Sequence, residues 1–462
     1  MSQYLKEAQW IYDLIKDRYT DSDGMLMYQI NSFSGEIVDH RILVSDFGDY
    51  IQNFYYLGVL TGRNDICQWS QQHLIQASKR YQDDSGFFVT EKGKNKVMIW
   101  DNADTFEGLA TFFHLSKEKE IYEIVKKFIS GIQKKKNRKG IIPESFTGII
   151  HSPFARSEYI GNFTEELVLL AHETGEKQYM KLAEQLVAPW VECSYFKEIG
   201  LIPNRLMCYS AAHYALALPL LTLKNNPFKR STLVKANTNL LSGILQLWNF
   251  APEAERPKYK AIIDHWKNGV EKHCATDGYY FGKYNAVNKT RSEYRRPLPD
   301  NHHVLAFYAD VFHFCRDPEY LLLLEKGCNF WLQNQQETGF FPESPVQQKG
   351  DNPKRAIMDS NLDLSIVFLK AFSLTGKKTY FTAAKQCLDA IVKYMKRDYG
   401  YIEMVHVHNG ELYLQPQFSY QEHGDFFTKY LTLFIKGLLL LHEVLQGNDI
   451  YRQDLFLLAR DR

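Results

Sequence analysis

The chain has 462 residues, 45% of them hydrophobic and 24% charged, which is the ordinary composition of a folded globular protein. Its 55 basic and 54 acidic side chains leave a formal net charge of +1, so we expect neither a nucleic-acid partner nor an anionic membrane surface. The seven cysteines form no C-x-x-C pair, and the N-terminus lacks a signal-peptide core. We therefore expect free thiols and a cytoplasmic location.

A glycine followed by bulky apolar residues recurs along the chain. The seven glycines are Gly24, Gly86, Gly140, Gly200, Gly278, Gly339 and Gly400, with steps of 62, 54, 60, 78, 61 and 61 residues. Glycine permits a turn that other residues resist, and the bulky residues suit a short extended segment. This spacing predicts seven copies of one structural unit.

Two kinds of helix alternate around these glycines. Amphipathic patterns precede them at 65–81, 118–132, 176–191, 318–332 and 378–395. More apolar patterns follow them at 47–60, 105–115, 162–174, 209–223, 302–315, 361–374 and 425–442. We expect the amphipathic helices to form an outer ring and the apolar helices a buried inner ring.

The pattern predicts an all-α fold, an (α/α)7 toroid of antiparallel helical hairpins with short β-segments at the hairpin tips. An (α/α)6 barrel and an open superhelix are the alternatives. Residues 1–462 are interpreted as one domain. The long step of 78 residues is interpreted as an insertion near 224–257.

Acidic residues are frequent where the predicted inner helices begin. In a toroid all inner helices start at the same end, so these side chains would converge on one central cleft. N-capping explains a single acidic residue at a helix start. It does not explain Asp49, Glu107 and Asp363, which lie inside their predicted helices. Buried carboxylates are costly unless they share protons, pair with cations or bind a polar ligand.

Carboxylates and aromatic rings together are suited to binding sugars, and cleavage of a glycosidic bond needs one protonated acid and one carboxylate. Asp300 and Asp359 are the first candidates for this catalytic pair, with Glu107 and Asp363 as alternates. The candidate substrate-binding residues are Trp100, Asp101, Asp49, His302, His303, Glu343, Phe341 and Asp425. Helix capping and core packing remain the alternative interpretations of each one.

The histidines offer a second chemistry. His302 or His303 could act as the base of a sugar epimerase or isomerase. His406, His408 and His423 could form a metal site, but we do not favour one. We find no G-x-S-x-G motif, P-loop or dinucleotide fingerprint. We therefore expect no cofactor and no metal.

The repeat and the inner-helix starts resemble the carbohydrate-active (α/α)-toroid enzymes. Phe106-Glu107 is similar to the Phe-Glu motif of the class I α-1,2-mannosidases, and the segment that starts at Asp300 is loosely similar to their Asp-His-Leu-Val segment. Asp363, twelve residues before Thr375-Gly376, is positioned like their catalytic base. The family's Arg-Pro-Glu and its calcium-binding threonine are absent, so calcium-assisted chemistry is not implied.

A second resemblance is to the unsaturated glucuronyl hydrolases. The segment 358–368 resembles one of their inner helices, and Asp300 lies one repeat earlier, where they place a second essential aspartate. They have six hairpins, and their His-Asp order is missing here. The histidine pattern of the sugar 2-epimerases and the Cys-His-Gly zinc motif of the lanthionine cyclases are also missing.

The leading hypothesis is a glycoside hydrolase or related glycan-processing enzyme that acts on an oligosaccharide or glycoside. A sugar epimerase or isomerase is the first alternative, and a non-catalytic glycan- or protein-binding toroid is the second. The sugar, the linkage, the stereochemical outcome and the oligomeric state stay open.

Overall fold

The computed structural model describes residues 2–21, 25–40, 47–89, 96–148, 150–208, 231–294, 296–345, 355–413 and 424–460. The chain divides into two compact units. The first comprises Met1–Ala77, Asp277–Tyr279 and Arg296–Asp461, and the second comprises Ser78–Thr276, Tyr280–Arg295 and Arg462. Within the described ranges, every helix is too short or too polar to cross a membrane.

The first unit is built from helices with small two- or three-stranded sheets at their ends. Its helices are α1 (Gln3–Arg18), α2 (Phe47–Thr61), most of α3 (Asn64–Tyr81), α12 (Pro297–Cys315), α13 (Pro318–Asn334), α14 (Met358–Thr375), α15 (Lys378–Ala390), the π-helix η3 (Ile391–Met395), α16 (Thr428–Leu445) and α17 (Gln453–Ala459). Its antiparallel sheets are β17-β1-β2 (Asp425–Phe427, Gln29–Asn31, Ile37–Asp39), β13-β16 (Arg355–Ile357, Met404–His406) and β14-β15 (Lys396–Arg397, Gly400–Tyr401). Helix α14 packs between α12 and α16.

The second unit has the same construction. Its helices are α4 (Ile99–Ser116), α5 (Lys119–Lys135), α6 (Glu158–Thr174), α7 (Lys177–Val191), α8 (Ser194–Ile199), α10 (Val234–Phe250), the 3-10 helix η2 (Glu253–Glu255) and α11 (Arg256–His273). Its antiparallel sheets are β3-β4-β5 (Lys96–Met98, Ser145–Thr147, Ile150–His151), β6-β7 (Phe154–Arg156, Arg205–Met207) and β12-β11-β8 (Thr290–Ser292, Lys283–Asn285, Ser231–Leu233). Strands β9 (Ala275–Thr276) and β10 (Tyr279–Tyr280) fall where the sequence passes between the units.

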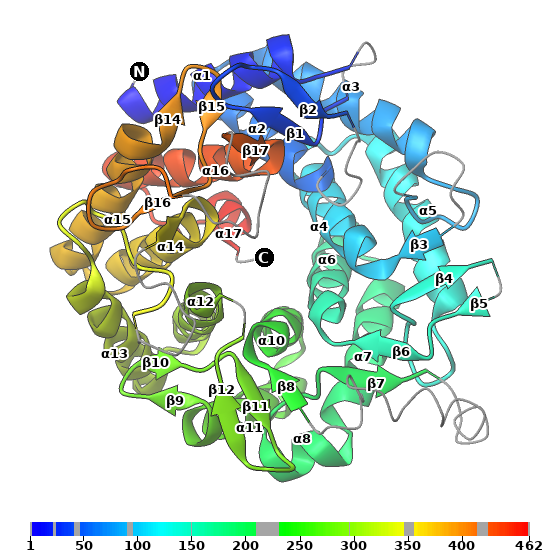
Figure 1. Ribbon diagram of the computed structural model, residues 1–462. Helices are drawn as coiled ribbons and strands as arrows, with labels where there is room; N and C mark the ends of the chain where they lie inside the picture. Colours follow the sequence, from blue (N-terminus) through cyan, green and yellow to red (C-terminus); the bar gives the residue numbers. More distant parts are fainter. Residues whose placement is uncertain are drawn as a thin grey trace. The chain divides into compact units, whose positions relative to one another are not determined.

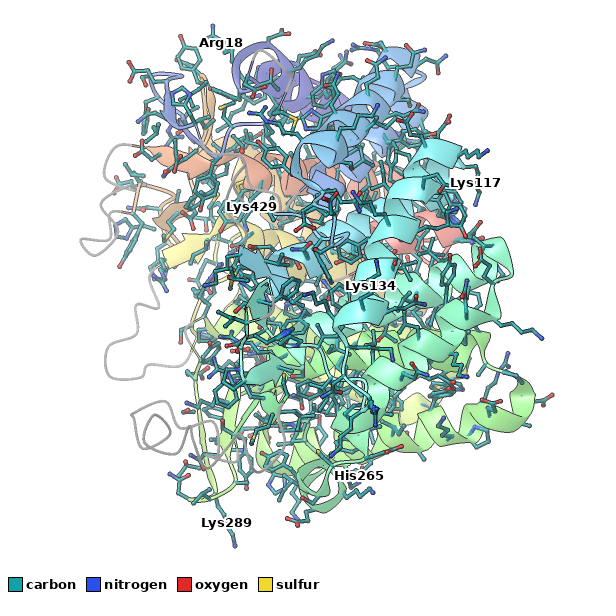
Figure 2. All side chains as sticks on the ribbon, turned by 90° about the vertical axis from the view of Figure 1, so that its right-hand side faces the viewer. Arg18, Lys117, Lys134, His265, Lys289 and Lys429 are labelled. Carbon is teal, nitrogen blue, oxygen red and sulfur yellow. The ribbon has the colours of Figure 1, made fainter. Side chains whose placement is uncertain are left out.

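Helices α4, α6 and α10 lie side by side in the second unit, with α5 and α7 on one side of this row (Figure 1). Figure 2 shows the two ends of this unit. Lys117, in the turn after α4, lies at one end, and Lys289, at the tip of the β11-β12 hairpin, lies at the other (Figure 2).

The predicted alternation of two kinds of helix is confirmed. Helix α5 buries only one stripe, Ile121, Val125, Phe128, Ile129 and Ile132, at the spacing of one helix face. Helix α12 is instead buried at every position from Asp300 to Val311. In the described residues seven helices follow the apolar pattern (α2, α4, α6, α10, α12, α14, α16) and seven the amphipathic one (α1, α3, α5, α7, α11, α13, α15).

The predicted insertion near 224–257 stays a prediction, and its described part is regular structure. Residues 231–257 form β8, α10, η2 and the start of α11, and α10 packs closely against α6. A Cβ atom at Gly161 of α6 would lie 1.7 Å from the carbonyl oxygen of Asn239, so only glycine allows this approach. The apolar helix of this repeat is therefore α10. The helix predicted at 209–223 lies outside the described residues.

Three apolar helices also begin earlier than predicted, and two of them, α4 and α14, directly follow a short strand. Helix α4 begins at Ile99 rather than 105, α12 at Pro297 rather than 302, and α14 at Met358 rather than 361. Asp101, Asp300 and Asp359 consequently lie in the first turn of their helices.

A buried asparagine attaches each of three apolar helices to the preceding glycine-aromatic segment. In α14, Asn361 Oδ1 accepts from the Phe341 N–H at 2.8 Å, and Asn361 Nδ2 donates to the Phe341 carbonyl at 3.1 Å and to the Ile357 carbonyl at 3.0 Å. Asn102 makes the same three bonds to Phe88 and Met98, and Asn237 makes them to Ile202 and Leu233. We call this arrangement the asparagine clamp.

We expect Asn361→Ala to lower the free energy of unfolding by about 3 kcal/mol, because each buried backbone group left unpaired costs about 1–3 kcal/mol. Urea unfolding followed by circular dichroism measures the change. Asn288→Ala, at an exposed position, is the matched control and should change stability by less than about 0.5 kcal/mol. Equal losses in both variants would contradict the structural role of the clamp.

Candidate carboxylate site

The first unit gathers ionisable side chains where α12 and α14 begin. Arg296 is the last extended residue before α12 and points its guanidinium toward α14. Its Nη1 donates to Asp359 Oδ2 at 2.8 Å, its Nη2 donates to Asp359 Oδ1 and Ser360 Oγ, and its Nε donates to Glu343 Oε1 at 3.1 Å. One arginine therefore connects two carboxylates from separate segments.

The electrostatics of this group fix the charge of Asp359, whose side chain is 18% exposed. Burial alone would raise the pKa of Asp359, but the charge and hydrogen bonds of Arg296, together with the Ser360 N–H, outweigh it and hold the pKa well below its ordinary value. Burial likewise disfavours the Arg296 cation, yet the carboxylates of Asp359 and Glu343 keep its pKa well above the ordinary value.

Asp359 is thus ionised at neutral pH, which does not suit the acid of the predicted Asp300–Asp359 pair, and its assignment to that pair stays a prediction. A proton donor must hold a proton at the working pH, and the ion pair with Arg296 removes it. Arg296 instead links Asp359 and Glu343 through ion pairs at the start of α14.

A second contact joins the same two helices. His302 Nε2 of α12 lies 3.6 Å from Asp363 Oδ2 of α14. The His302 imidazole is buried, whereas the Asp363 side chain is 25% exposed. The rings of His302 and His303 stack, with centroids 4.5 Å apart. Asp300, in the first turn of α12, is only 2% exposed.

The second unit holds a separate group of acids on α4 and α6. Oxygens of Glu107, Glu165 and Glu166 lie within 4.8 Å of one another, and all three residues are buried. Asn162 Nδ2 donates to Glu107 Oε2 at 3.0 Å and to Asp104 Oδ1 at 3.2 Å. Carboxylate oxygens are ligands that hard divalent cations prefer, so these glutamates could hold such an ion. The expectation that the chain needs no metal stays a prediction.

The remaining candidates differ in their surroundings. Trp100 is 49% exposed at the start of α4, and its neighbour Asp101 is buried. Asp425 lies in β17, where its Oδ1 accepts from Asn31 Nδ2 at 2.9 Å. Asp49 is in α2, but its side chain lies outside the described part of the chain.

Phe341 is a core residue, which corrects its prediction as a sugar-binding residue. Its side chain is fully buried, and its ring stacks on Phe368 with centroids 5.3 Å apart. The backbone of Phe341 is also held by the asparagine clamp. Its aromatic face is therefore not available to a ligand.

Two residues of these groups were missed by the sequence analysis. Arg296 directly precedes Pro297, the first residue of the apolar helix α12. A search for acids alone could not find it. Glu166 follows Glu165 and was overlooked because adjacent helix residues usually face different neighbours. Of the histidines considered for a metal, His406 packs on Tyr413, His408 contacts Gln336, and His423 lies outside the described residues.

Neither a family model nor a curated protein matches this chain. Among solved structures, it is similar to the α-1,2-mannosidase from Trichoderma reesei, with a TM-score of 0.63 and 13% identity, covering 94% of this chain and 92% of that one. It is similar to a sugar epimerase from a ruminal bacterium (TM-score 0.57, 12% identity, 88% of this chain and 100% of that one). It is also similar to D-mannose isomerase (TM-score 0.55, 12% identity, 96% and 98%).

These likenesses show the fold. The chain has the all-α (α/α)-toroid fold of carbohydrate-active enzymes, so the predicted fold class and the predicted resemblance to this group are confirmed. Hydrolases and isomerases both occur among the similar structures, and one fold hosts many reactions. The fold therefore does not determine the reaction, which depends on the side chains of the site.

The ion pair should make the free energy of unfolding depend on pH. Because the pKa of Asp359 is lowered by folding, its stabilising contribution is complete above the ordinary value of 3.8 and is lost as the pH falls through the lower folded value. At pH 7 we expect Asp359→Asn to lower the free energy of unfolding by about 1.5–3 kcal/mol. This difference from wild type should shrink as the pH falls below about 4. Urea unfolding at several pH values measures it, and a pH-independent difference would contradict the ion pair's role.

Proposed function

We propose that this chain is a glycoside hydrolase that uses Asp300 as proton donor and Asp363 as catalytic base or nucleophile. The observation that carries the proposal is that three aspartates on two adjacent helices have three different environments. Asp300 is buried, Asp359 is fixed by an arginine, and Asp363 is partly exposed beside an imidazole. In glycoside hydrolases the acid and the base are usually two carboxyl groups whose environments give them different pKa values.

The roles follow from these environments. Burial opposes ionisation of a carboxyl group, so Asp300 is suited to keep and deliver a proton to the glycosidic oxygen. Asp363 is exposed enough to meet a substrate or a water molecule, and His302 supports its ionised form. The Arg296–Asp359 ion pair holds the start of α14 against α12, which positions both groups.

The substrate class we propose is an oligosaccharide or simple glycoside. The most informative first substrates are mannosides, because an α-1,2-mannosidase and a D-mannose isomerase are among the similar structures. Exposed Trp100 and buried Asp101, both in the second unit, stay predicted sugar-binding residues. Aromatic faces cover the apolar face of a sugar ring, and carboxylates accept its hydroxyl hydrogens.

We expect Asp300→Asn and Asp363→Asn each to lower kcat by about a hundredfold to ten-thousandfold, the range of general acid–base catalysis. The measurement is release of 4-nitrophenol from a panel of α- and β-nitrophenyl glycosides, and of monosaccharides from α-1,2-mannobiose, cellobiose and maltose. Asp277→Asn is the matched control, since this exposed aspartate has a positive φ that asparagine also tolerates. Undiminished turnover in both site variants would reject the assignment.

A sugar isomerase or epimerase is a second candidate, favoured by the contact between His302 and Asp363. A carboxylate 3.6 Å from one imidazole nitrogen orients the neutral ring and stabilises the imidazolium that forms when the other nitrogen accepts a proton. Such an imidazole can remove a proton from the carbon beside a sugar carbonyl. In this reaction Asp363 assists His302 rather than attacking a glycosidic bond.

Under this alternative, we expect wild type to interconvert free aldoses in deuterated water, with deuterium entering at C2. His302→Gln should lower that rate by at least about a hundredfold. Proton NMR of the sugars measures both, and His408→Gln, at an exposed position, is the control. Hydrolysis of glycosides without any deuterium at C2 would exclude this candidate. Saturable binding of a sugar, without hydrolysis of glycosides and without deuterium at C2, would support the non-catalytic binding toroid.

A further inference from the structure

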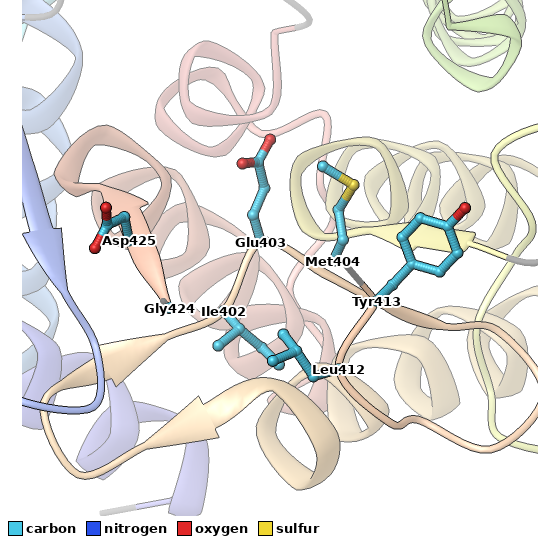
Figure 3. A pocket seen from close by; sticks show the side chains of 7 residues that line it. All are labelled: Ile402, Glu403, Met404, Leu412, Tyr413, Gly424 and Asp425. Atoms are coloured by element: carbon cyan, nitrogen blue, oxygen red, sulfur yellow. The ribbon is translucent and has the colours of Figure 1, made fainter. Parts of the chain in front are cut away.

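A small pocket in the first unit has a mixed apolar and acidic lining. Its walls come from the end of the glycine-aromatic segment, the following hairpin and the start of β17: Ile402, Glu403, Met404, Leu412, Tyr413, Gly424 and Asp425. In Figure 3 the side chains of Glu403, Met404 and Tyr413 extend toward the same side, and those of Ile402 and Leu412 extend away from it.

The polar groups of the pocket are held by the fold. The Glu403 carbonyl accepts from the Met358 N–H at 2.9 Å, which anchors this segment to the start of α14. The Tyr413 N–H donates to the Met404 carbonyl at 3.3 Å. Asp425 is oriented by the Asn31 amide. The backbone of Glu403 and of Tyr413 and the side chain of Asp425 are thus held around one space.

Tyr413 supplies an independent sign of a ligand. The residue is only 7% exposed, and its ring packs against His406 with centroids 4.8 Å apart. Its hydroxyl nevertheless makes no hydrogen bond to any described residue. A tyrosine hydroxyl in a largely buried position usually finds a partner.

The size of the pocket limits what it can hold. Its empty space is about 220 Å³ including the part open to solvent, and the centre of a water molecule can occupy only about 10 Å³ of it. On that measure, about 10–15 Å³ holds one water molecule. The space therefore suits a single hydroxyl group at the edge of a sugar ring, with Met404 and the Tyr413 ring as its apolar wall.

We infer that this pocket is a subsite that binds the hydroxyl edge of a neutral pyranose through Tyr413, Glu403 and Asp425. The inference rests on the proposed function, because it assigns a sugar as the ligand. The carboxylates accept hydroxyl hydrogens, and the Tyr413 hydroxyl both donates and accepts. Two carboxylates repel an anionic sugar, so the subsite selects uncharged rings over uronates.

The test is equilibrium binding by the full chain, measured by titration with ligand-observed NMR. The probes are methyl α-D-mannopyranoside, methyl α-D-glucopyranoside, methyl β-D-glucopyranoside and methyl α-D-glucopyranosiduronate. Tyr413→Phe removes only the hydroxyl and keeps the ring, and Glu403→Gln removes only the charge. Tyr122→Phe, whose hydroxyl donates to Glu176 in the second unit, is the matched control.

We expect the dissociation constant of at least one neutral probe to rise about two- to tenfold in each pocket variant, as for the loss of one hydrogen bond, and to stay unchanged in the control. The uronate should bind more weakly than its neutral counterpart. Thermal unfolding checks that each variant is folded.

Failure of this inference is distinguishable from failure of the proposed hydrolase. Unchanged binding in both pocket variants, or no binding of any probe to wild type, overturns the subsite even if glycosides are cleaved. Weakened binding in the pocket variants supports the subsite even if wild type cleaves no glycoside.

Discussion

The asparagine clamp is the interaction on which the geometry of this chain depends. The N–H and carbonyl of the second residue after the glycine, Phe88, Ile202 or Phe341, are buried and need hydrogen-bond partners. Asn102, Asn237 and Asn361 supply both groups from the first turn of the next apolar helix. Each clamp fixes where its helix begins relative to the preceding segment. Residues beside the asparagine, such as Asp101 and Asp359, are positioned by the same bonds.

The repeat could be predicted because glycine spacing and apolar periodicity are local properties of sequence. The apolar helix α10 of the fourth unit was not predicted, and the reason is physical. The start of α10 carries polar residues, among them Lys235, Asn237 and Asn239, which interrupt the apolar pattern there. The polar asparagine is itself what the buried position requires. An asparagine near the start of each apolar pattern would have placed α10 correctly.

The candidate site was only partly predictable, because residue type does not determine electrostatic environment. Asp300, Asp359 and Asp363 are alike in sequence, yet one is buried, one is bound to Arg296 and one contacts His302. These differences arise from the packing of α12 against α14, which joins residues about sixty positions apart. The same limit explains Phe341: an aromatic residue at a segment tip can face a ligand or the core, and the clamp turns this one inward.

The environment of Asp363 also separates the two reactions that this fold supports. A hydrolytic base or nucleophile must leave its imidazole partner to reach an anomeric carbon or a water molecule, whereas an isomerase needs the carboxylate to remain on the imidazole. A separation of 3.6 Å is longer than a good charge-assisted hydrogen bond, and the Asp363 side chain is a quarter exposed while His302 is buried. The carboxylate is thus the more accessible member of the pair. That asymmetry favours a role for Asp363 on substrate over a role confined to orienting His302.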